Sequence, residues 1–397
     1  MTLFKNINRS DFFVCIWSIY MLQGLLYPQG IINQLLQLIM IVWGLIVFYR
    51  YVFSQLKLPT LLKSVSILCL MYIVYGVVNI LFGREDFGLR HVSDYEYLRQ
   101  SLNSLLPIFV FYDFSRRGLL TYDRIKRYMI FFIPLFIVLF MRQQQLMLME
   151  FGQEETTNNE GYMFVSLLAY VYFFYKRPLS QYIMICILMV FVILSVKRGA
   201  ILIFMFGAIY FLFTPLKKVT RRKKFVNILL SLTLVAFAIY FIQSRMSSSE
   251  YFMSRLESTI DGNTSGRDDI YHSILNEVTQ EKNIFRFLFG RGANSTIAIA
   301  GNYAHQDWLE TLCNNGIIGC CIVLYFLISL ISLLIKSYRT IKPPMFDAFI
   351  TLAFVILAKT MFSMSIQNLD LSQSLLLGFL AFETRKHNGL NVPTSYE

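Results

Sequence analysis

Long runs of apolar residues recur along the whole of this chain and constrain its fold more than any other feature. An α-helix rises ~1.5 Å per residue, so about 20 apolar residues cross a hydrocarbon layer of ~30 Å. Hydrophobic residues make up 56% of the 397 positions and charged residues only 15%. A soluble domain does not need so many apolar runs, so the sequence predicts an all-α polytopic membrane protein.

The spacing of these runs predicts about twelve transmembrane helices. We find no internal repeat and no low-complexity linker, so residues 1–397 are expected to form a single membrane domain. The first run is interpreted as a retained helix rather than a signal peptide, because no small-residue cleavage site follows it. The expected membrane-spanning cores are residues 12–27, 31–49, 61–82, 101–113, 128–141, 162–175, 181–196, 200–214, 225–242, 316–335, 346–365 and 371–383.

Charge predicts how these helices are oriented. The densest basic cluster lies between residues 217 and 224, and by the positive-inside rule this segment is cytoplasmic. Alternation from there places both termini in the cytoplasm and residues 243–304 in one large extracytoplasmic loop. Most lysines and arginines then lie inside and most acidic residues outside. The net charge of +12 therefore reports orientation and not binding to nucleic acid.

The large outer loop is predicted to contain an amphipathic helix. Ser265 has the chemistry of an N-cap, and two aspartates follow Arg267 in what would be the first turn. Apolar residues then recur at helical spacing. Such a helix either lies against the membrane or roofs a cavity. The apolar positions are Ile270, Tyr271, Ile274, Leu275 and Val278.

Several cations on the predicted outer face are candidates for binding phosphate. Lys197 and Arg198 lie between two apolar runs, where they either snorkel to lipid phosphates or grip a diphosphate, with Arg198 as the main ligand. Arg267 lies beside the amides of a helix start, which favour an anion, or it pairs with a nearby aspartate. Arg291, between two glycines, is a weaker candidate.

His305 is the candidate general base. It opens a polar turn ahead of an apolar run, with Asp307, Trp308 and Glu310 close by as supporting residues. The ordinary pKa of histidine, ~6.5, suits proton transfer near neutral pH, although a lone histidine is more often structural. The other histidines lie in the C-terminal tail, on the outer helix and in an arginine-rich outer loop: His387, His272, and His91 with Arg84, Arg90 and Arg99.

Lys359 lies inside an apolar run, where a charge is costly and usually faces a cavity or a partner. It either pairs with an acid such as Asp370 or lines a substrate cavity. The sequence contains no G-x-x-x-x-G-K-[ST] element and no His/Cys cluster. The acidic residues between positions 85 and 96 are interpreted as solvated. We therefore expect no metal site and no cofactor.

Three elements in order resemble the O-antigen ligase/polymerase family of bacterial membrane glycosyltransferases. The first is Ser195-Val196-Lys197-Arg198-Gly199-Ala200 between two spans. The second is the long outer loop with Ser265-Gly266-Arg267 and then Phe289-Gly290-Arg291-Gly292. The third is Ala304-His305-Gln306-Asp307-Trp308-Leu309-Glu310, closing on Gly316-Ile317-Ile318-Gly319. The family usually shows His-Asn or His-Ser where this chain has His305-Gln306.

The resemblance implies a lipid-linked glycan, typically on undecaprenyl diphosphate, as donor and acceptor at the outer face of the bacterial cytoplasmic membrane. It implies an inverting transfer without metal, in which His305 deprotonates an acceptor hydroxyl. Arg198 and Arg267 would then stabilise the leaving diphosphate. A flippase and a chain-length regulator are the expected partners.

Three functions remain open from the sequence. A polymerase would move a growing glycan onto the next lipid-linked repeat unit, and we favour it because no part of the chain resembles a separate acceptor-docking domain. A ligase would use the same donor with a lipid A-core or protein acceptor. A transporter or flippase for the same lipid-linked sugar would need no base, so it would tolerate loss of His305.

Overall fold

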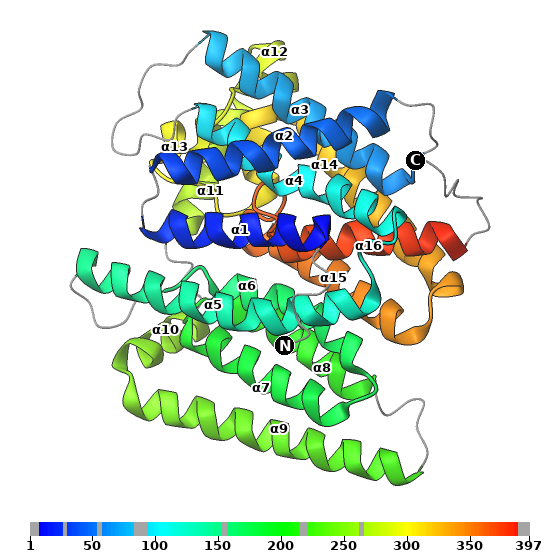
Figure 1. Ribbon diagram of the computed structural model, residues 1–397. Helices are drawn as coiled ribbons and strands as arrows, with labels where there is room; N and C mark the ends of the chain where they lie inside the picture. The colour runs from blue at the N-terminus through cyan, green and yellow to red at the C-terminus, as the bar shows by residue number, and fades with distance from the viewer. Residues whose placement is uncertain are drawn as a thin grey trace.

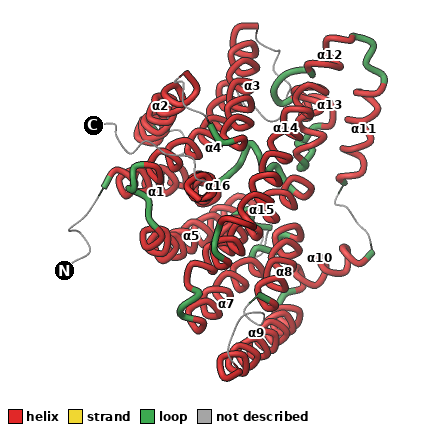
Figure 2. The backbone as a smooth tube through the Cα atoms, turned by 90° about the vertical axis from the view of Figure 1, so that its right-hand side faces the viewer, coloured by secondary structure: helices red, strands yellow, loops and turns green. Residues whose placement is uncertain are grey.

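The protein is a bundle of helices of very different lengths (Figures 1 and 2). A computed structural model describes residues 8–26, 30–53, 58–82, 94–151, 157–214, 221–261 and 266–387. No strand occurs in these ranges. The helices are α1 (Arg9–Leu26), α2 (Ile31–Phe53), α3 (Thr60–Phe82), α4 (Asp94–Arg116), α5 (Tyr122–Phe151), α6 (Gly161–Ser166), the 3-10 helix η1 (Leu167–Phe174), α7 (Pro178–Leu194), α8 (Arg198–Phe213), α9 (Arg221–Ser248), α10 (Glu250–Ile260), α11 (Arg267–Thr279), α12 (Ile284–Phe289), α13 (Ser295–Ala300), α14 (Asp307–Thr340), α15 (Pro343–Phe362) and α16 (Leu371–His387).

Each sequence-predicted span coincides with helical structure, but the boundaries differ. Residues 162–175 form α6 followed by the 3-10 helix η1, and α9 runs on to Ser248 past the predicted end at 242. Five described helices are long and apolar enough to cross a membrane: Ile31–Phe53, Thr60–Leu81, Lys224–Ser248, Asp307–Thr340 and Pro343–Phe362. Shorter apolar helices cover Gly161–Phe174, Pro178–Leu194 and Arg198–Phe213. The protein is thus a multi-pass membrane protein, and twelve crossings remain a prediction.

Helix α2 is polar on its inner face and apolar on its outer face. Asn33 and Gln37 are buried, and Gln37 Nε2 donates to Tyr20 Oη at 3.3 Å. Ile31 and Leu38 on the same helix are 76% and 53% exposed. In water this arrangement would be unfavourable, because apolar surface is driven inside. In lipid it is favourable, because an inward-facing polar group finds a partner and the outer face meets hydrocarbon.

Helix α9 lies at the lower edge of the molecule in both views, with the rest of the bundle on one side only (Figures 1 and 2). Only 11% of its apolar window is buried. Leu232 and Tyr240 are 63% and 69% exposed. Helix α9 therefore faces lipid around most of its circumference.

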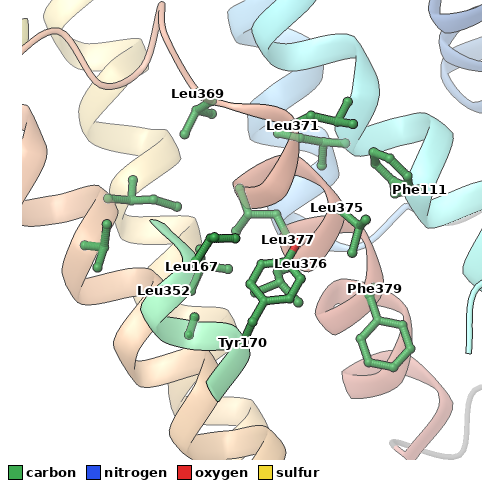
Figure 3. Packing of buried hydrophobic residues seen from close by; sticks show 14 of the residues in the cluster. Phe111, Leu167, Tyr170, Leu352, Leu369, Leu371, Leu375, Leu376, Leu377 and Phe379 are labelled. Carbon is green, nitrogen blue, oxygen red and sulfur yellow. The ribbon is translucent and has the colours of Figure 1, made fainter. Parts of the chain in front are cut away.

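The core is centred on α16, which is almost entirely buried. Leu375, Leu376 and Leu377 are fully buried, and Figure 3 shows Tyr170 of η1 and Phe379 beside them. Tyr170 Oη donates to the carbonyl oxygen of Ser372 at 2.6 Å. One continuous cluster of buried apolar side chains extends from α1 to α16, so the N-terminal and C-terminal helices share a core.

Close contact between α16 and α4 depends on Gly378. A Cβ at this position would lie 2.6 Å from the carbonyl oxygen of Ile108 and 2.7 Å from the amide nitrogen of Tyr112. Both atoms belong to the α4 backbone, which cannot rotate away. The two helices therefore approach more closely than any side chain would permit.

We expect Gly378→Ala to push α16 away from α4 and to lower the melting temperature of the purified protein in detergent. The expected cost is roughly 1–3 kcal/mol of overpacking. Gly24→Ala is the matched control, because its Cβ would meet only ordinary contacts at 3.8–3.9 Å from Asn33. An equal melting temperature for the two variants would contradict this account of the α4–α16 contact.

Candidate functional site

Helix α14 is broken at Gly316, which follows Asn314 and Asn315. Gly316 has φ 68° and ψ −165°, so the helix stops and restarts there. The break deprives carbonyl oxygens at the end of the first half of their helical partners. The amides of Arg291 and Gly292 supply two of the missing bonds, to Cys313 and Asn314 at 2.9 and 3.0 Å.

A tyrosine of helix α3 also hydrogen-bonds to backbone carbonyl groups at the break. Tyr75 Oη donates to the carbonyl oxygen of Asn315 at 3.1 Å and to that of Phe289 at 2.6 Å. Tyr97 of α4 donates to Asn315 Oδ1 at 3.1 Å. The first half of α14, residues 307–315, is thus held as a short separate helix against the bundle.

Glu310 fixes the chain just before His305. Its side chain is 1% exposed, and its Oε2 accepts the amide of Ala304 at 2.9 Å. Its Oε1 accepts Thr296 Oγ1 at 2.7 Å and Asn314 Nδ2 at 3.2 Å. Three segments are therefore tied to one buried carboxylate, and Ala304 itself is fully buried.

Asp307 fixes the chain just after His305. Its carboxylate is 3% exposed and accepts the amides of Ser365 at 2.7 Å and Ile366 at 3.2 Å. These amides belong to the connection between α15 and α16, which we call the 363–370 connection. Asp307 therefore attaches the His305 turn to this connection.

His305 lies between these two anchors in a left-handed backbone conformation, with φ 53°. This region is uncommon for any residue other than glycine, and such strain persists only where the surroundings enforce it. The side chain is half-buried. Trp308, one turn into α14, packs against the main core. The turn therefore holds the imidazole of His305 rigidly and leaves it partly accessible.

Helix α11 forms the roof over this turn, as its amphipathic pattern predicts. Ile274 is fully buried and Val278 is 9% exposed, and both belong to a small apolar cluster with Ala304 and Cys313. Figure 2 shows α11, α12 and α13 together beside α14. The helix begins at Arg267, after Gly266, whereas the expected N-cap Ser265 lies outside the described residues.

Four cations from three segments converge at the start of α8. Lys197 and Arg198 occupy the turn between α7 and α8, Arg267 begins α11, and Arg255 lies on α10. Burial lowers the pKa of Lys197 to about 8, and repulsion from Arg267, Arg255 and Arg198 adds to the effect. Because a bound anion would relieve this mutual repulsion, the cluster is a candidate anion site.

Arg255 was missed by the sequence interpretation. It lies three residues after Phe252, which is 6% exposed and part of the main core. Residues three apart share a helix face, so Arg255 is directed inward with Phe252. The amphipathic pattern of residues 250–260 could have indicated this, because an arginine on an apolar face is unusual.

The cation cluster and the His305 turn meet at the end of α15. Arg267 Nη1 donates to the carbonyl oxygen of Phe362 at 3.5 Å, and Tyr162 Oη donates to the same oxygen at 3.4 Å. Gly199 lies against Tyr162 and Phe362 so closely that a Cβ would clash with both. Only two residues lie between Phe362 and Ser365, whose amide binds Asp307.

Arg291 is engaged elsewhere. Its guanidinium pairs with Glu277 Oε1 and Glu281 Oε2, both at 2.5 Å, and donates to the carbonyl oxygen of Glu277 at 3.3 Å. These partners belong to α11 and the residues after it. Arg291 thus attaches the 290–292 turn to α11, so its guanidinium is paired with acids and is not part of the candidate anion site.

Lys359 faces a buried group of carboxylates. It is 6% exposed, its Nζ donates to the carbonyl oxygen of Asn368 at 3.2 Å, and it lies 5.5 Å from the centre of the Tyr162 ring. It interacts electrostatically with Asp370, Asp307 and Glu160. The acids around Lys359 favour the first of the two interpretations, pairing with an acid such as Asp370.

Two other residues that the sequence singled out, Arg99 and His272, lie on described helices. Arg99 is on α4, whereas His91, Arg84 and Arg90 lie outside the described residues. His272 is exposed on α11. No group of three or more His, Cys, Asp or Glu side chains able to hold a metal occurs within the described part of the chain.

We expect Gly290→Ala to disrupt the close contact between the 290–292 turn and the α14 break. Gly290 has φ 77°, and a Cβ there would lie 2.5 Å from backbone atoms of Asn314 and Asn315. Gly301→Ala is the control, because φ is 69° there but no atom lies within 4 Å. In the control, the stability should fall only by the cost of a left-handed backbone conformation for alanine, roughly 1–2 kcal/mol. Thermal unfolding should show a clearly larger loss for Gly290→Ala, and equal losses would contradict the proposed close contact.

Glu160 is expected to make stability pH-dependent. Burial raises the pKa of this carboxyl from 4.5 to about 7, against the attraction of Lys359, and its Oε2 has no hydrogen-bond partner among the described residues. A raised carboxyl pKa means that the folded state binds the extra proton between pH 4.5 and 7, so stability falls as pH rises through this window.

The melting temperature measured from pH 5 to 8 tests this expectation. Glu160→Gln should reduce this fall, whereas Glu257→Gln, an exposed site on α10, should leave it unchanged. A pH profile of Glu160→Gln parallel to that of the unchanged protein would show that Glu160 is ionised throughout.

Comparison with known proteins identifies the segment that carries these features. The family model described as O-antigen ligase matches residues 182–324. No curated protein matches the chain. The matched segment contains Lys197, Arg198, Arg255, Arg267 and His305. Over residues 182–324 the chain is therefore similar to the O-antigen ligase family.

Proposed function

We propose that this protein is a membrane glycosyltransferase that transfers a glycan from a polyprenyl diphosphate to a sugar hydroxyl. The observation that carries the proposal is that the His305 turn and the cation cluster both bind the segment from Phe362 to Ser365. The His305 turn is bound at Ser365 and the cation cluster at Phe362, so a candidate base and a candidate anion site lie on one short segment.

The cation cluster suits the diphosphate of such a donor. A diphosphate carries two to three negative charges, and Arg198, Arg255 and Arg267 present guanidinium forks that match phosphate oxygens. Lys197 adds a fourth positive charge when protonated. Because burial and repulsion lower its pKa, an anion bound beside it would favour the protonated form.

The proposed reaction is a single displacement at the anomeric carbon. His305 accepts the proton of the acceptor hydroxyl, and the oxygen forms the new glycosidic bond. The bond between the anomeric carbon and the phosphate oxygen breaks, and the polyprenyl diphosphate leaves with its electron pair. The arginines stabilise the charge that develops on this leaving group, and the configuration inverts.

The acceptor distinguishes two versions of this function. In the polymerase the acceptor is the next undecaprenyl-diphosphate-linked repeat unit, and this is the version we propose. A ligase with a lipid A-core or protein acceptor is the second candidate, which the description of the matched family favours. The donor site serves both.

We further propose that the site faces the extracytoplasmic side of the bacterial cytoplasmic membrane, with both termini in the cytoplasm. The basic segments at the opposite ends of the helices support this orientation. A flippase that delivers the donor and a regulator of chain length are the proposed partners.

Loss of His305 should abolish transfer. His305→Ala is expected to lower the rate by about 10²–10⁴-fold, the usual contribution of a general base. His272→Ala, on the exposed face of α11, should retain normal activity. The assay follows glycan transfer by purified protein in liposomes. Full transfer activity of His305→Ala would show that His305 is not the base. If the unchanged protein transfers no glycan but moves lipid-linked sugar across the bilayer, and His305→Ala does the same, the protein is instead a flippase.

Loss of any arginine of the cluster should also impair transfer. Arg198→Ala, Arg255→Ala and Arg267→Ala are each expected to cost about 10²–10³-fold in rate, because each removes charge from the leaving group. Arg339→Ala, exposed on α14, is the control. Normal rates in Arg255→Ala would remove α10 from the proposed site and leave the other two arginines.

Reconstitution with one substrate at a time identifies the acceptor. A lipid-linked repeat unit alone should yield a ladder of longer glycans if the protein is a polymerase. Transfer that begins only when lipid A-core is added would establish the ligase. Adding a chelator tests whether either reaction requires a metal, and we expect no change in rate.

A further inference from the structure

A groove on the opposite side of the bundle from the His305 turn combines arginines with a lipid-facing apolar wall. It lies between α1, α2 and α4 and has a volume of about 560 Å³. Its polar end contains Arg9, Arg50, Arg117 and Asp113, and Trp43 lines its middle. No residue of the groove belongs to the site described above.

The groove is polar at one end and apolar along the rest of its length. On α2 the lining runs from Leu38 to Arg50, which corresponds to about 18 Å of helix. Leu38 and Ile46 are 53% and 57% exposed. One leaflet of a bilayer has about 15 Å of hydrocarbon, so the groove is as long as one acyl chain.

The polar end carries excess positive charge. Asp113 pairs with Arg117 Nε at 2.7 Å and accepts Tyr51 Oη at 2.9 Å, so this carboxylate is already neutralised within the fold. Arg9 and Arg50 are exposed at the same end. Three arginines against one aspartate therefore favour an anionic group beside the apolar wall.

The membrane position of this end agrees with a lipid headgroup. Helix α1 begins where α2 and α4 end, on the right of the bundle in Figure 1, opposite α11 and α13. The positive-inside rule places this end at the cytoplasmic surface, where anionic lipids give a negative surface potential.

We propose that the groove binds an anionic glycerophospholipid of the cytoplasmic leaflet. The headgroup phosphate lies between Arg9 and Arg50, and Arg117 contributes while it pairs with Asp113. One acyl chain lies along α2, in contact with Trp43 and the exposed apolar residues. The proposal stands independently of the reaction proposed for the His305 site.

Trp43 provides the test, because it lines the groove and reports quenching by a brominated acyl chain. The full chain is reconstituted in nanodiscs that contain increasing fractions of brominated phosphatidylglycerol or brominated phosphatidylcholine. Trp43→Phe identifies the share of the fluorescence that comes from Trp43. Two arginines are expected to give on the order of tenfold preference for the anionic lipid.

Charge variants distinguish a specific lipid site in the groove from general attraction of anionic lipid to the basic surface of the protein. The double variant Arg9→Gln/Arg50→Gln should lose the preference, whereas Arg339→Gln/Lys342→Gln removes two charges from exposed positions near the same membrane surface and should keep it. Arg117 is left intact because its bond to Asp113 belongs to the fold. Unchanged circular dichroism and melting temperature confirm that the variants are folded.

Three results would overturn the proposal. Equal quenching by the two lipids would mean that the groove does not select charge. Loss of the preference in both double variants would mean that total surface charge attracts the lipid. Absence of quenching by either lipid would mean that a protein segment, such as a helix of a second copy, fills the groove.

Discussion

The break in α14 at Gly316 is the constraint on which the region from α11 to the start of α14 depends. A continuous helix would satisfy its own carbonyl groups and leave nothing for the 290–292 turn to bind. Because the helix stops, the carbonyl groups of Cys313 and Asn314 become acceptors for this turn. Arg291 then joins the turn to α11, and α11 covers Ala304. One left-handed glycine therefore organises the loop, the roof helix and the His305 turn.

The same region concentrates charge in places where charge is expensive. Asp307, Glu310 and Lys359 are almost fully buried, and four cations gather at the start of α8. Asp307 accepts two backbone amides, and Glu310 accepts one amide and two side-chain donors, which keeps the His305 turn rigid. The cations repel one another instead. The diphosphate donor that we propose would offset this repulsion when bound.

The rest of the bundle is arranged for a different solvent. Helix α2 buries Asn33 and Gln37 and exposes isoleucine and leucine, and α9 exposes nearly its whole surface. Hydrocarbon explains both, because it gives no reason to hide apolar side chains. Close packing then depends on small residues such as Gly378 rather than on hydrophobic driving force. The arginine-lined groove between α1, α2 and α4 lies where this lipid-facing surface meets the headgroups.

By itself the sequence determined that the protein is helical and lies in a membrane, because the length and apolarity of a run suffice for that prediction. It also predicted the amphipathic helix α11 from the spacing of its apolar residues. Only the tertiary structure decided which charged residues meet. Arg255 and the 363–370 connection joined the site because helices far apart in sequence pack side by side there. Arg291 is not part of the candidate site, because its guanidinium forms ion pairs with Glu277 and Glu281. Spacing along a chain gives the face of a helix, whereas the neighbour of that face depends on how all the helices pack.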